Sequence, residues 1–240
     1  MAATLMNDAN QSNTNEPAVV LLSGGMDSAV LLAYVVKTLG CGPVHALSFD
    51  YGQRHLRELE CAQWQAEAIG AAEYRTIDLG FVAGLVEGGT TLVKGGEEVP
   101  DLSDLNEAGL DQPPTYVPNR NMMLLSVAVA YAEARGIHDV FYGAQAQDEY
   151  GYWDCTGDFI ERLNLVLELN RRDRVTVQAP FVDKKKCELV SLGNELGVDF
   201  SHTWSCYRGG ETACGTCPTC VERLKAFRET GATDPLVYET

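Results

Sequence analysis

The chain has 240 residues, of which 45% are apolar and 22% are charged, so it can bury a sizeable core in one or two domains. No apolar stretch approaches the roughly 20 residues that span a bilayer, and the Asn-rich start has no basic segment followed by an apolar one. The net charge of −16 disfavours stable binding to nucleic acid. We therefore expect a cytoplasmic protein without a membrane segment, preceded by a disordered tail at residues 1–16.

Strands and helices are predicted to alternate from residue 18 to residue 197. Residues 18–22 form an apolar run that ends at a glycine pair, which is typical of a strand buried on both faces. Asp27 and Ser28 then offer N-cap side chains to a helix at 29–39. Further strands are expected at 44–49, 74–77, 139–143 and 175–178, and further helices at 54–69, 121–134, 158–169 and 184–196. This alternation predicts an α/β fold with a doubly wound, mostly parallel five-stranded sheet.

Two segments depart from the alternation. Residues 84–118 are rich in glycine and proline, and a loop of that length inside a compact domain is typical of a lid or a binding segment. Residues 200–240 differ in composition from what precedes them. We interpret them as a small metal-binding segment packed on an α/β domain that spans residues 17–199.

The loop after the first strand reads Ser23-Gly24-Gly25-Met26-Asp27-Ser28. Its glycines allow close approach of the backbone to an anion, and successive N–H groups with a helix N-terminus can hold negative oxygens. It lacks the lysine of a Walker A loop and does not read GxGxxG. It resembles the pyrophosphate loop of the N-type ATP pyrophosphatases, which cleave ATP between its α and β phosphates. The alternative is a glycine turn with an aspartate cap.

Four cysteines lie within fifteen residues, at positions 206, 214, 217 and 220. In a cytosolic chain this clustering favours a metal site over disulfides. Four thiolates suit tetrahedral Zn²⁺, and an iron–sulfur cluster is the alternative. Because Cys206, Cys214, Cys217 and Cys220 would fill all four positions, we expect the metal to be structural.

Several further stretches resemble the 7-cyano-7-deazaguanine synthases. They are Phe49-Asp50-Tyr51-Gly52-Gln53-Arg54-His55, Tyr116-Val117-Pro118-Asn119-Arg120-Asn121, Lys186-Cys187-Glu188-Leu189-Val190 and Thr203-Trp204-Ser205-Cys206-Tyr207. With the cysteine cluster they cover about residues 18 to 238. One segment departs from the family pattern, because Glu149, Tyr150 and Trp153 replace its usual Tyr, Ser and Pro.

The resemblance implies a sheet of the adenine nucleotide alpha hydrolase type and a ligase that uses ATP, Mg²⁺ and ammonia. Such an enzyme converts a deazapurine carboxylate to a nitrile through an adenylated acid and an adenylated amide. We expect no glutaminase domain beside the ATP domain in a chain of this length, and we therefore expect ammonia to come from solution or from another protein. The resemblance also implies a homodimer, which the apolar helix predicted near Met122–Ala134 favours.

The residues expected to act follow from these motifs. The catalytic set is Asp27, which would bind Mg²⁺, with Ser28, Arg120 and Lys186. The nucleotide-binding set is Leu22, Ser23, Gly24, Gly25, Met26, Asp27, Ser28, Ala29, Val30, Leu31, Leu32 and Phe49. The substrate-binding set is Asp148, Tyr152 and Asp154. Arg120 and Lys186 could instead be surface charges, Asp148 and Asp154 could be helix caps, and Cys155 could be a buried thiol without a catalytic role.

Two other functions fit parts of the pattern. One is a different pyrophosphate-loop enzyme, acting on a related deazapurine or on tRNA, although the acidic charge argues against an RNA-binding surface. The other is a zinc-bearing binding module whose loop no longer acts on ATP. Turnover of ATP to AMP distinguishes any enzyme of this kind from such a module.

Overall fold

A computed structural model of the chain describes residues 15–54, 56–105, 113–146 and 152–239. Its centre is one five-stranded sheet in which every neighbouring pair of strands is parallel. The strand order is β3-β2-β1-β4-β5, with β1 at Ala18–Leu21, β2 at Val44–Asp50, β3 at Glu73–Asp78, β4 at Asp139–Phe141 and β5 at Thr176–Gln178. The predicted α/β class and parallel sheet are confirmed.

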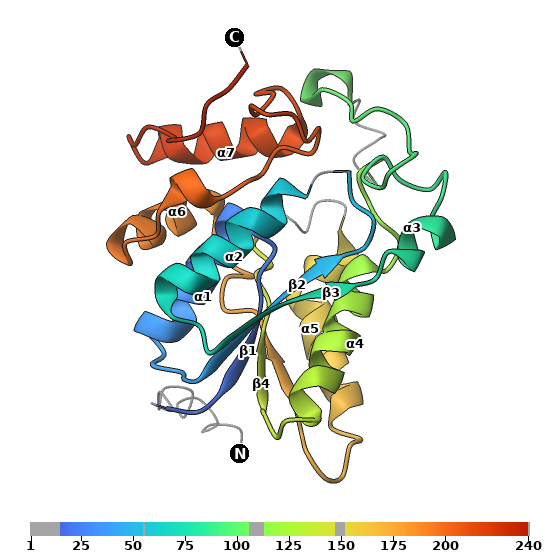
Figure 1. Ribbon diagram of the computed structural model, residues 1–240, viewed down its shortest axis with the longest axis vertical. Coiled ribbons are helices and arrows are strands. Elements are labelled where there is room, and N and C mark those ends of the chain that lie inside the picture. Colours follow the sequence, from blue (N-terminus) through green and yellow to red (C-terminus); the bar gives the residue numbers. More distant parts are fainter. Residues whose placement is uncertain (1–14, 55, 106–112, 147–151, 240) are drawn as a thin grey trace, which may run out of the picture.

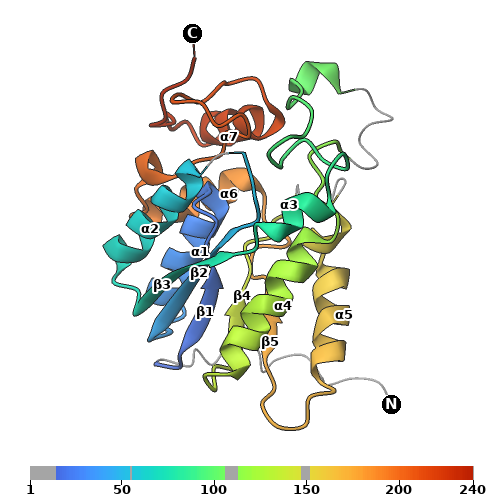
Figure 2. The ribbon, with the colours of Figure 1, turned by 45° about the vertical axis from the view of Figure 1, so that its right-hand side comes forward.

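Helices cover both faces of the sheet (Figures 1 and 2). One face carries α1 (Met26–Lys37), α2 (Arg57–Ile69) and α6 (Lys186–Glu195), and the other carries α4 (Arg120–Glu133) and α5 (Gly157–Leu167). All four residues of β1 are buried, and alternate side chains enter opposite layers of the core. The wholly apolar run at 18–22 is thus explained by a central strand that is covered on both sides.

The C-terminal segment packs directly on the α/β domain. It contains a short 3-10 helix at Phe200–His202 and the helix α7 (Pro218–Glu229), which lies beside α6 (Figure 1). Phe200 and Phe227 share a core cluster with α1. Gly193 makes this packing possible, because a Cβ there would lie 2.4 Å from the Phe200 ring and 2.8 Å from a Val30 methyl group. The C-terminal segment and the α/β domain therefore share one core.

The glycine-rich stretch that follows β3 is mostly irregular where it is described. Its described residues hold the short helices α3 (Phe81–Leu85) and η1 (Leu102–Asp104). The Arg54 side chain donates hydrogen bonds to the carbonyl groups of Thr91, Gly96 and Glu97, which ties this stretch to the chain after β2. The predicted lack of regular structure thus holds for the part of 84–118 that is described.

The predicted tail falls mostly outside the described residues, which begin at Asn15. The Asn15 N–H donates to the Gly40 carbonyl and the Glu16 carbonyl accepts from the Gly42 N–H, both at 2.9 Å. The last two residues of that range therefore contact the turn after α1. Among the described residues, no helix combines the length and the apolar character that crossing a membrane requires.

Candidate functional site

The glycine loop lies where the strand order reverses. It follows β1, and β1 lies between β2 and β4, whose crossovers run to opposite faces of the sheet. Ligands of doubly wound folds bind at the carboxyl ends of the strands at this switch point. Gly143, just after β4, approaches the loop so closely that a Cβ there would lie 3.6 Å from the Ser28 backbone. The glycine loop and the residue that follows β4 therefore lie side by side.

Hydrogen bonds between two serines close the loop. The Ser28 hydroxyl donates to the Gly25 carbonyl at 3.0 Å and lies 3.0 Å from the Ser23 hydroxyl. The Ser23 N–H donates to the Ser28 Oγ at 3.2 Å, and the Gly25 N–H donates to the Ser23 Oγ at 3.2 Å. The loop therefore holds its shape before any ligand binds.

The predicted N-cap role of Asp27 and Ser28 is wrong. Helix α1 begins at Met26, its N-cap is Gly25 in an extended conformation, and no side chain caps it. Because the helix starts earlier than predicted, both side chains lie in its first turn. An N-terminus without a side-chain cap leaves backbone N–H groups for a ligand, and the helix dipole favours an anion there.

Gly24 is required by its conformation and by its neighbours. Its φ is +86°, in the region that favours glycine. A Cβ on Gly24 would lie 1.8 Å from the Glu58 carbonyl oxygen in the first turn of α2. The loop can therefore pack against α2 only with glycine at this position.

Lys186 and Asp27 meet beside the loop. The Lys186 side chain, at the start of α6, is buried, and its Nζ lies 3.7 Å from the Asp27 Oδ2 and 3.1 Å from the Glu222 Oε2. Burial raises the pKa of Asp27, although the nearby Lys186 acts in the opposite direction. The Asp27 Oδ1 has no hydrogen-bond partner among the described residues. Lys186 is thus not a solvated surface charge, and Asp27 offers one oxygen to a ligand.

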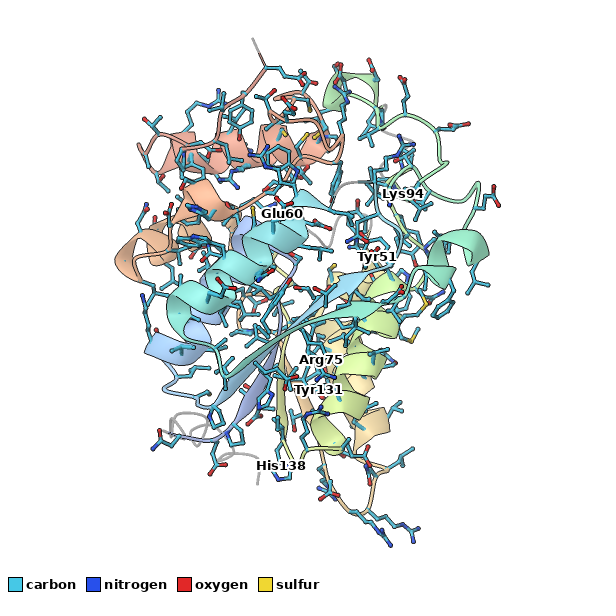
Figure 3. The ribbon with its side chains drawn as sticks, in the orientation of Figure 1. Tyr51, Glu60, Arg75, Lys94, Tyr131 and His138 are labelled. Atoms are coloured by element: carbon cyan, nitrogen blue, oxygen red, sulfur yellow. The ribbon has the colours of Figure 1, made fainter. Side chains whose placement is uncertain are left out.

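Arg120 begins α4 on the opposite face of the sheet. Its guanidinium donates to the Tyr51 hydroxyl at 3.5 Å and lies 5.9 Å from the centre of the Tyr51 ring. Figure 3 shows Tyr51 just beyond the end of β2, at the end of the sheet opposite His138, which precedes β4. Arg120 therefore belongs to the loop end of the molecule.

Of the predicted substrate residues that are described, Asp154 contacts the first turn of α4 and Tyr152 contacts Thr115. Asp154 is 1% exposed, its Oδ2 accepts from the Asn121 N–H at 3.2 Å, and burial raises its pKa. Its Oδ1 has no hydrogen-bond partner among the described residues. The Tyr152 hydroxyl lies 2.6 Å from the Thr115 hydroxyl. Asp148 lies outside the described residues.

Cys155 is buried beside Asp154. Its sulfur lies 3.2 Å from both the Asn121 Nδ2 and the Tyr142 hydroxyl. The thiol is 5% exposed, and Asn121 follows Arg120 in the first turn of α4. The structure thus brings Arg120, Asp154 and Cys155 into one polar cluster, although 34 residues separate Asn121 from Cys155 in the sequence.

Seven residues of the predicted nucleotide-binding set have side chains buried in the core. Their side chains are at most 6% exposed: Leu22, Met26, Ala29, Val30, Leu31, Leu32 and Phe49. These side chains pack between the sheet and its helices. Access for a nucleotide is therefore concentrated at the other loop residues, which are Ser23, Gly24, Gly25, Asp27 and Ser28.

The four clustered cysteines come together as predicted. Their sulfur atoms all lie within 4.8 Å of one another, and all four residues are buried: Cys206, Cys214, Cys217 and Cys220. The Cys214 N–H donates to the Cys206 sulfur and the Cys217 N–H donates to the Cys214 sulfur, which stabilises thiolates. Hydrogen bonds from Cys206 and then Cys220 lower the pKa of the Cys217 thiol. The arrangement fits a bound metal ion.

A family model described as queuosine biosynthesis protein QueC matches residues 17–231. That match covers nearly all of the described chain. The chain belongs to the QueC family.

The relatives of this QueC family member agree with that assignment. The 7-cyano-7-deazaguanine synthase of Trichodesmium erythraeum is 43% identical over 225 residues, which cover 92% of this chain and 99% of that protein. The one of Caldicellulosiruptor saccharolyticus is 44% identical over 222 residues, covering 92% and 95%. A comparison with solved structures found NMN synthetase from Francisella tularensis, with a TM-score of 0.48, 17% identity and coverage of 92% of this chain and 79% of that one.

Sequence reasoning missed two residues at the site of this QueC family member. Glu222 pairs with Lys186 at 3.1 Å, and Trp204 donates its backbone N–H to the Gly24 carbonyl at 2.9 Å. Trp204 lies in a stretch that carries the family resemblance, which was a signal for its importance but not for its contact. Nothing local in the sequence marks Glu222, because only the packing of α7 against α6 brings it to Lys186.

Proposed function

We propose that this QueC family member is an ATP-dependent ligase that converts 7-carboxy-7-deazaguanine and ammonia to 7-cyano-7-deazaguanine. One observation carries the proposal: a glycine loop closed by its own hydrogen bonds lies at the switch point of the sheet with Lys186 and Asp27 beside it. The names of the relatives supply the product. The loop's resemblance to those of the ATP pyrophosphatases supplies the α–β cleavage.

The first step makes the carboxylate reactive. A substrate carboxylate oxygen attacks the α-phosphorus of ATP, the bond to the β-phosphate breaks, and pyrophosphate leaves with the bonding electrons. The backbone N–H groups of Gly24 and of the first turn of α1, from Met26 to Ser28, would hold the pyrophosphate oxygens. The ammonium group of Lys186 would stabilise negative charge at the phosphates. Mg²⁺ bound with ATP, held by Asp27, would neutralise further phosphate charge.

The second stage installs nitrogen. Ammonia adds to the acyl-adenylate carbon, AMP leaves, and a proton is lost to give the primary amide. The amide oxygen then attacks the α-phosphorus of a second ATP, and the bond to the β-phosphate breaks so that a second pyrophosphate leaves. Loss of the two N–H protons with departure of AMP then gives the nitrile. Arg120, on the opposite face of the sheet from Lys186, would stabilise charge on the departing AMP.

Asp154 and Tyr152 would bind the deazapurine. Asp154 offers a buried oxygen with no protein partner among the described residues, and a carboxyl group can accept from the N–H groups of a guanine-like edge. A ligand donor would satisfy an atom that is costly to leave unpaired in the interior. We keep Asp148 in this set on the resemblance alone.

We propose that the cysteine cluster holds Zn²⁺. Tetrahedral Zn–S bonds of about 2.3 Å place sulfur atoms about 3.8 Å apart. The observed sulfur atoms, all within 4.8 Å of one another, fit one ion better than an iron–sulfur cluster, which separates its ligands further. Bound zinc would add its binding free energy to folding. With four protein ligands it would have no open position for catalysis.

The alternative is another adenylating enzyme of the pyrophosphate-loop type, acting on a related deazapurine or on tRNA. Its loop and its cationic side chains would be the same as in the proposed enzyme. Only the residues that bind the base would therefore distinguish the two functions. The net charge of −16 disfavours a tRNA surface.

One experiment tests the proposal directly. The protein is incubated with ATP, Mg²⁺, ¹⁵N-labelled ammonium and 7-carboxy-7-deazaguanine, and the products are followed by mass spectrometry. The expected result is a labelled nitrile together with AMP and pyrophosphate. AMP formed with another acid or with tRNA, and not with this carboxylate, supports the alternative. Absence of AMP in every mixture would contradict an ATP pyrophosphatase activity.

We also propose a cytoplasmic homodimer. An apolar groove beside α3 and α4 supports it, lined by Leu79, Phe81, Val82, Met122, Met123 and Val127. The Phe81 side chain is 67% exposed and Leu85 next to the groove is 72% exposed. A second copy of the chain would bury these side chains.

A further inference from the structure

The loop is held between α2 and the segment that precedes the cysteine cluster. On one side, the backbone of Glu58 in α2 leaves no room for a side chain at Gly24. On the other side, the Trp204 N–H donates to the Gly24 carbonyl at 2.9 Å. Because the peptide group is planar and trans, fixing the Gly24 carbonyl also fixes the direction of the Gly25 N–H. That N–H donates to the Ser23 Oγ at 3.2 Å, so the contact with Trp204 also supports the serine bonds that hold the loop in shape.

The Trp204 side chain ties this contact to two other elements. Its indole N–H donates to the carbonyl of Cys206, a residue of the cysteine cluster, at 3.0 Å. The Arg57 guanidinium of α2 lies 4.3 Å from the centre of the indole. The side chain is 2% exposed. Trp204 therefore contacts the loop, α2 and the cysteine cluster at once.

Helix α7 fixes the residues on both sides of Trp204. Arg223 is 1% exposed and donates to the Thr203 hydroxyl at 2.7 Å and to the Ser205 hydroxyl at 3.3 Å. Asp234 accepts two hydrogen bonds from its guanidinium, at 2.8 and 3.0 Å. The Thr219 hydroxyl donates to the Ser205 carbonyl at 2.7 Å, and Thr219 lies between two of the clustered cysteines. The segment 203–205 is thus attached to the metal-binding part of the chain.

We propose that Trp204 is a positioning residue for pyrophosphate, through which the cysteine cluster sets the geometry of the loop. The inference rests on the proposed function, because it assumes that the loop binds the pyrophosphate part of ATP. Under it, the C-terminal segment acts on the nucleotide without touching it. Loosening Trp204 then weakens anion binding at the loop while the metal stays bound.

The test is Trp204→Phe, which keeps an aromatic ring and the backbone N–H but removes the indole donor to Cys206. Binding of inorganic pyrophosphate with Mg²⁺ is measured by titration calorimetry, and zinc content is measured alongside. One lost hydrogen bond predicts a Kd about fivefold higher. The KM for ATP should rise by a similar factor, with the KM for ammonium unchanged.

Trp153→Phe is the matched control. It also removes an indole donor, here to the Tyr116 hydroxyl at 2.8 Å, but among the described residues no hydrogen bond joins the Trp153 side chain to the loop. It should leave pyrophosphate binding unchanged. If Trp204→Phe does not fold, Thr219→Val removes the bond to Ser205 with little change in shape, and it should weaken pyrophosphate binding in the same direction.

The outcomes distinguish failure of the proposed function from failure of the positioning role of Trp204. Wild-type protein that binds no pyrophosphate and forms no AMP contradicts the proposed function and this inference with it. If the wild type binds pyrophosphate and Trp204→Phe binds it equally tightly, the positioning role alone is overturned. The same holds for Thr219→Val where that variant is used. Loss of zinc in the variant together with weaker binding would also overturn it, because the effect would then come from the metal site.

Discussion

Asp27→Asn tests whether the carboxylate beside the loop acts on ATP or only stabilises the fold. The side chain lies in the first turn of α1 and caps nothing, so its stabilising contacts are the ion pair with Lys186 and the helix dipole. Asparagine has nearly the same shape and no charge. Any change in turnover without a change in stability then reports the loss of charge at the phosphates.

The contacts of Asp27 predict that Asp27→Asn has only a small effect on stability. At 3.7 Å the Asp27–Lys186 attraction amounts to about 4 kcal/mol at an effective dielectric constant near 20, before desolvation of both groups. Burial raises the pKa of Asp27, so desolvation outweighs that attraction. Lys186 keeps its shorter ion pair with Glu222, and the dipole contributes about 0.3–1 kcal/mol. We expect the free energy of unfolding to change by about 1 kcal/mol at most, which shifts Tm by about 2–4 °C.

The effect on turnover is large if Asp27 holds Mg²⁺. Removing one preorganised group that stabilises transition-state charge costs about 10²–10³ in kcat. AMP release is measured by a coupled assay over a range of Mg²⁺ concentrations, and Tm is measured by calorimetry. We expect Asp27→Asn to keep its Tm within the stated shift, to lose at least about a hundredfold in kcat, and to require more Mg²⁺.

Asp158→Asn is the control, because Asp158 is also the second residue of a helix, α5, and pairs with Arg162 on the surface. It should shift Tm slightly and leave turnover unchanged. The reasoning about Asp27 is refuted if Asp27→Asn turns over ATP at the wild-type rate per folded molecule with the same dependence on Mg²⁺.

The remaining predictions concern the metal site, the sheet and the assembly. Cys217→Ala should lose zinc and most of its soluble yield, as measured by metal analysis, and a stable variant without metal would contradict a structural zinc. Glu73→Gln should reduce the loss of stability in acid: a hydrogen bond from Tyr131 lowers the pKa of Glu73 from 4.5 to about 2, so its contribution is present above 4.5 and lost as pH falls toward 2. Denaturant curves at pH 7 and pH 3 check this, and an unchanged difference would count against it. Light scattering should show a dimer that Phe81→Glu dissociates, whereas a wild-type monomer at micromolar concentration would exclude it.

The site near Glu73 shows why this acid effect is local. Glu73 accepts from the Tyr131 hydroxyl at 2.7 Å and pairs with Arg75 at 2.6 Å. Figure 3 shows Arg75 and Tyr131 next to each other along the sheet, and the Arg75 guanidinium lies 5.9 Å from the Tyr131 ring centre. Among the described residues, no hydrogen bond or ion pair joins Glu73, Arg75 or Tyr131 to the glycine loop. Glu73→Gln should therefore not change turnover.

Local patterns were enough to predict the sheet, the loop and the cluster of four cysteines. The apolar run of β1 marks a central strand because a parallel sheet covered on both faces has no polar side to show. The glycine pair after it marks a close approach, since Gly24 requires a positive φ. The short spacing of Cys214, Cys217 and Cys220 allows their sulfur atoms to meet without help from the rest of the fold.

Tertiary structure alone decided which distant side chains meet at the loop. Lys186 reaches Asp27 because α6 packs beside α1, and Glu222 reaches Lys186 because α7 packs on α6. The start of α1 also depended on packing, because Gly24 is held between α2 and Trp204 and the helix begins only after the extended Gly25. Sequence periodicity reports which face of an element is buried. It does not report what that face is buried against, because parallel crossovers bring together segments that are far apart in the chain.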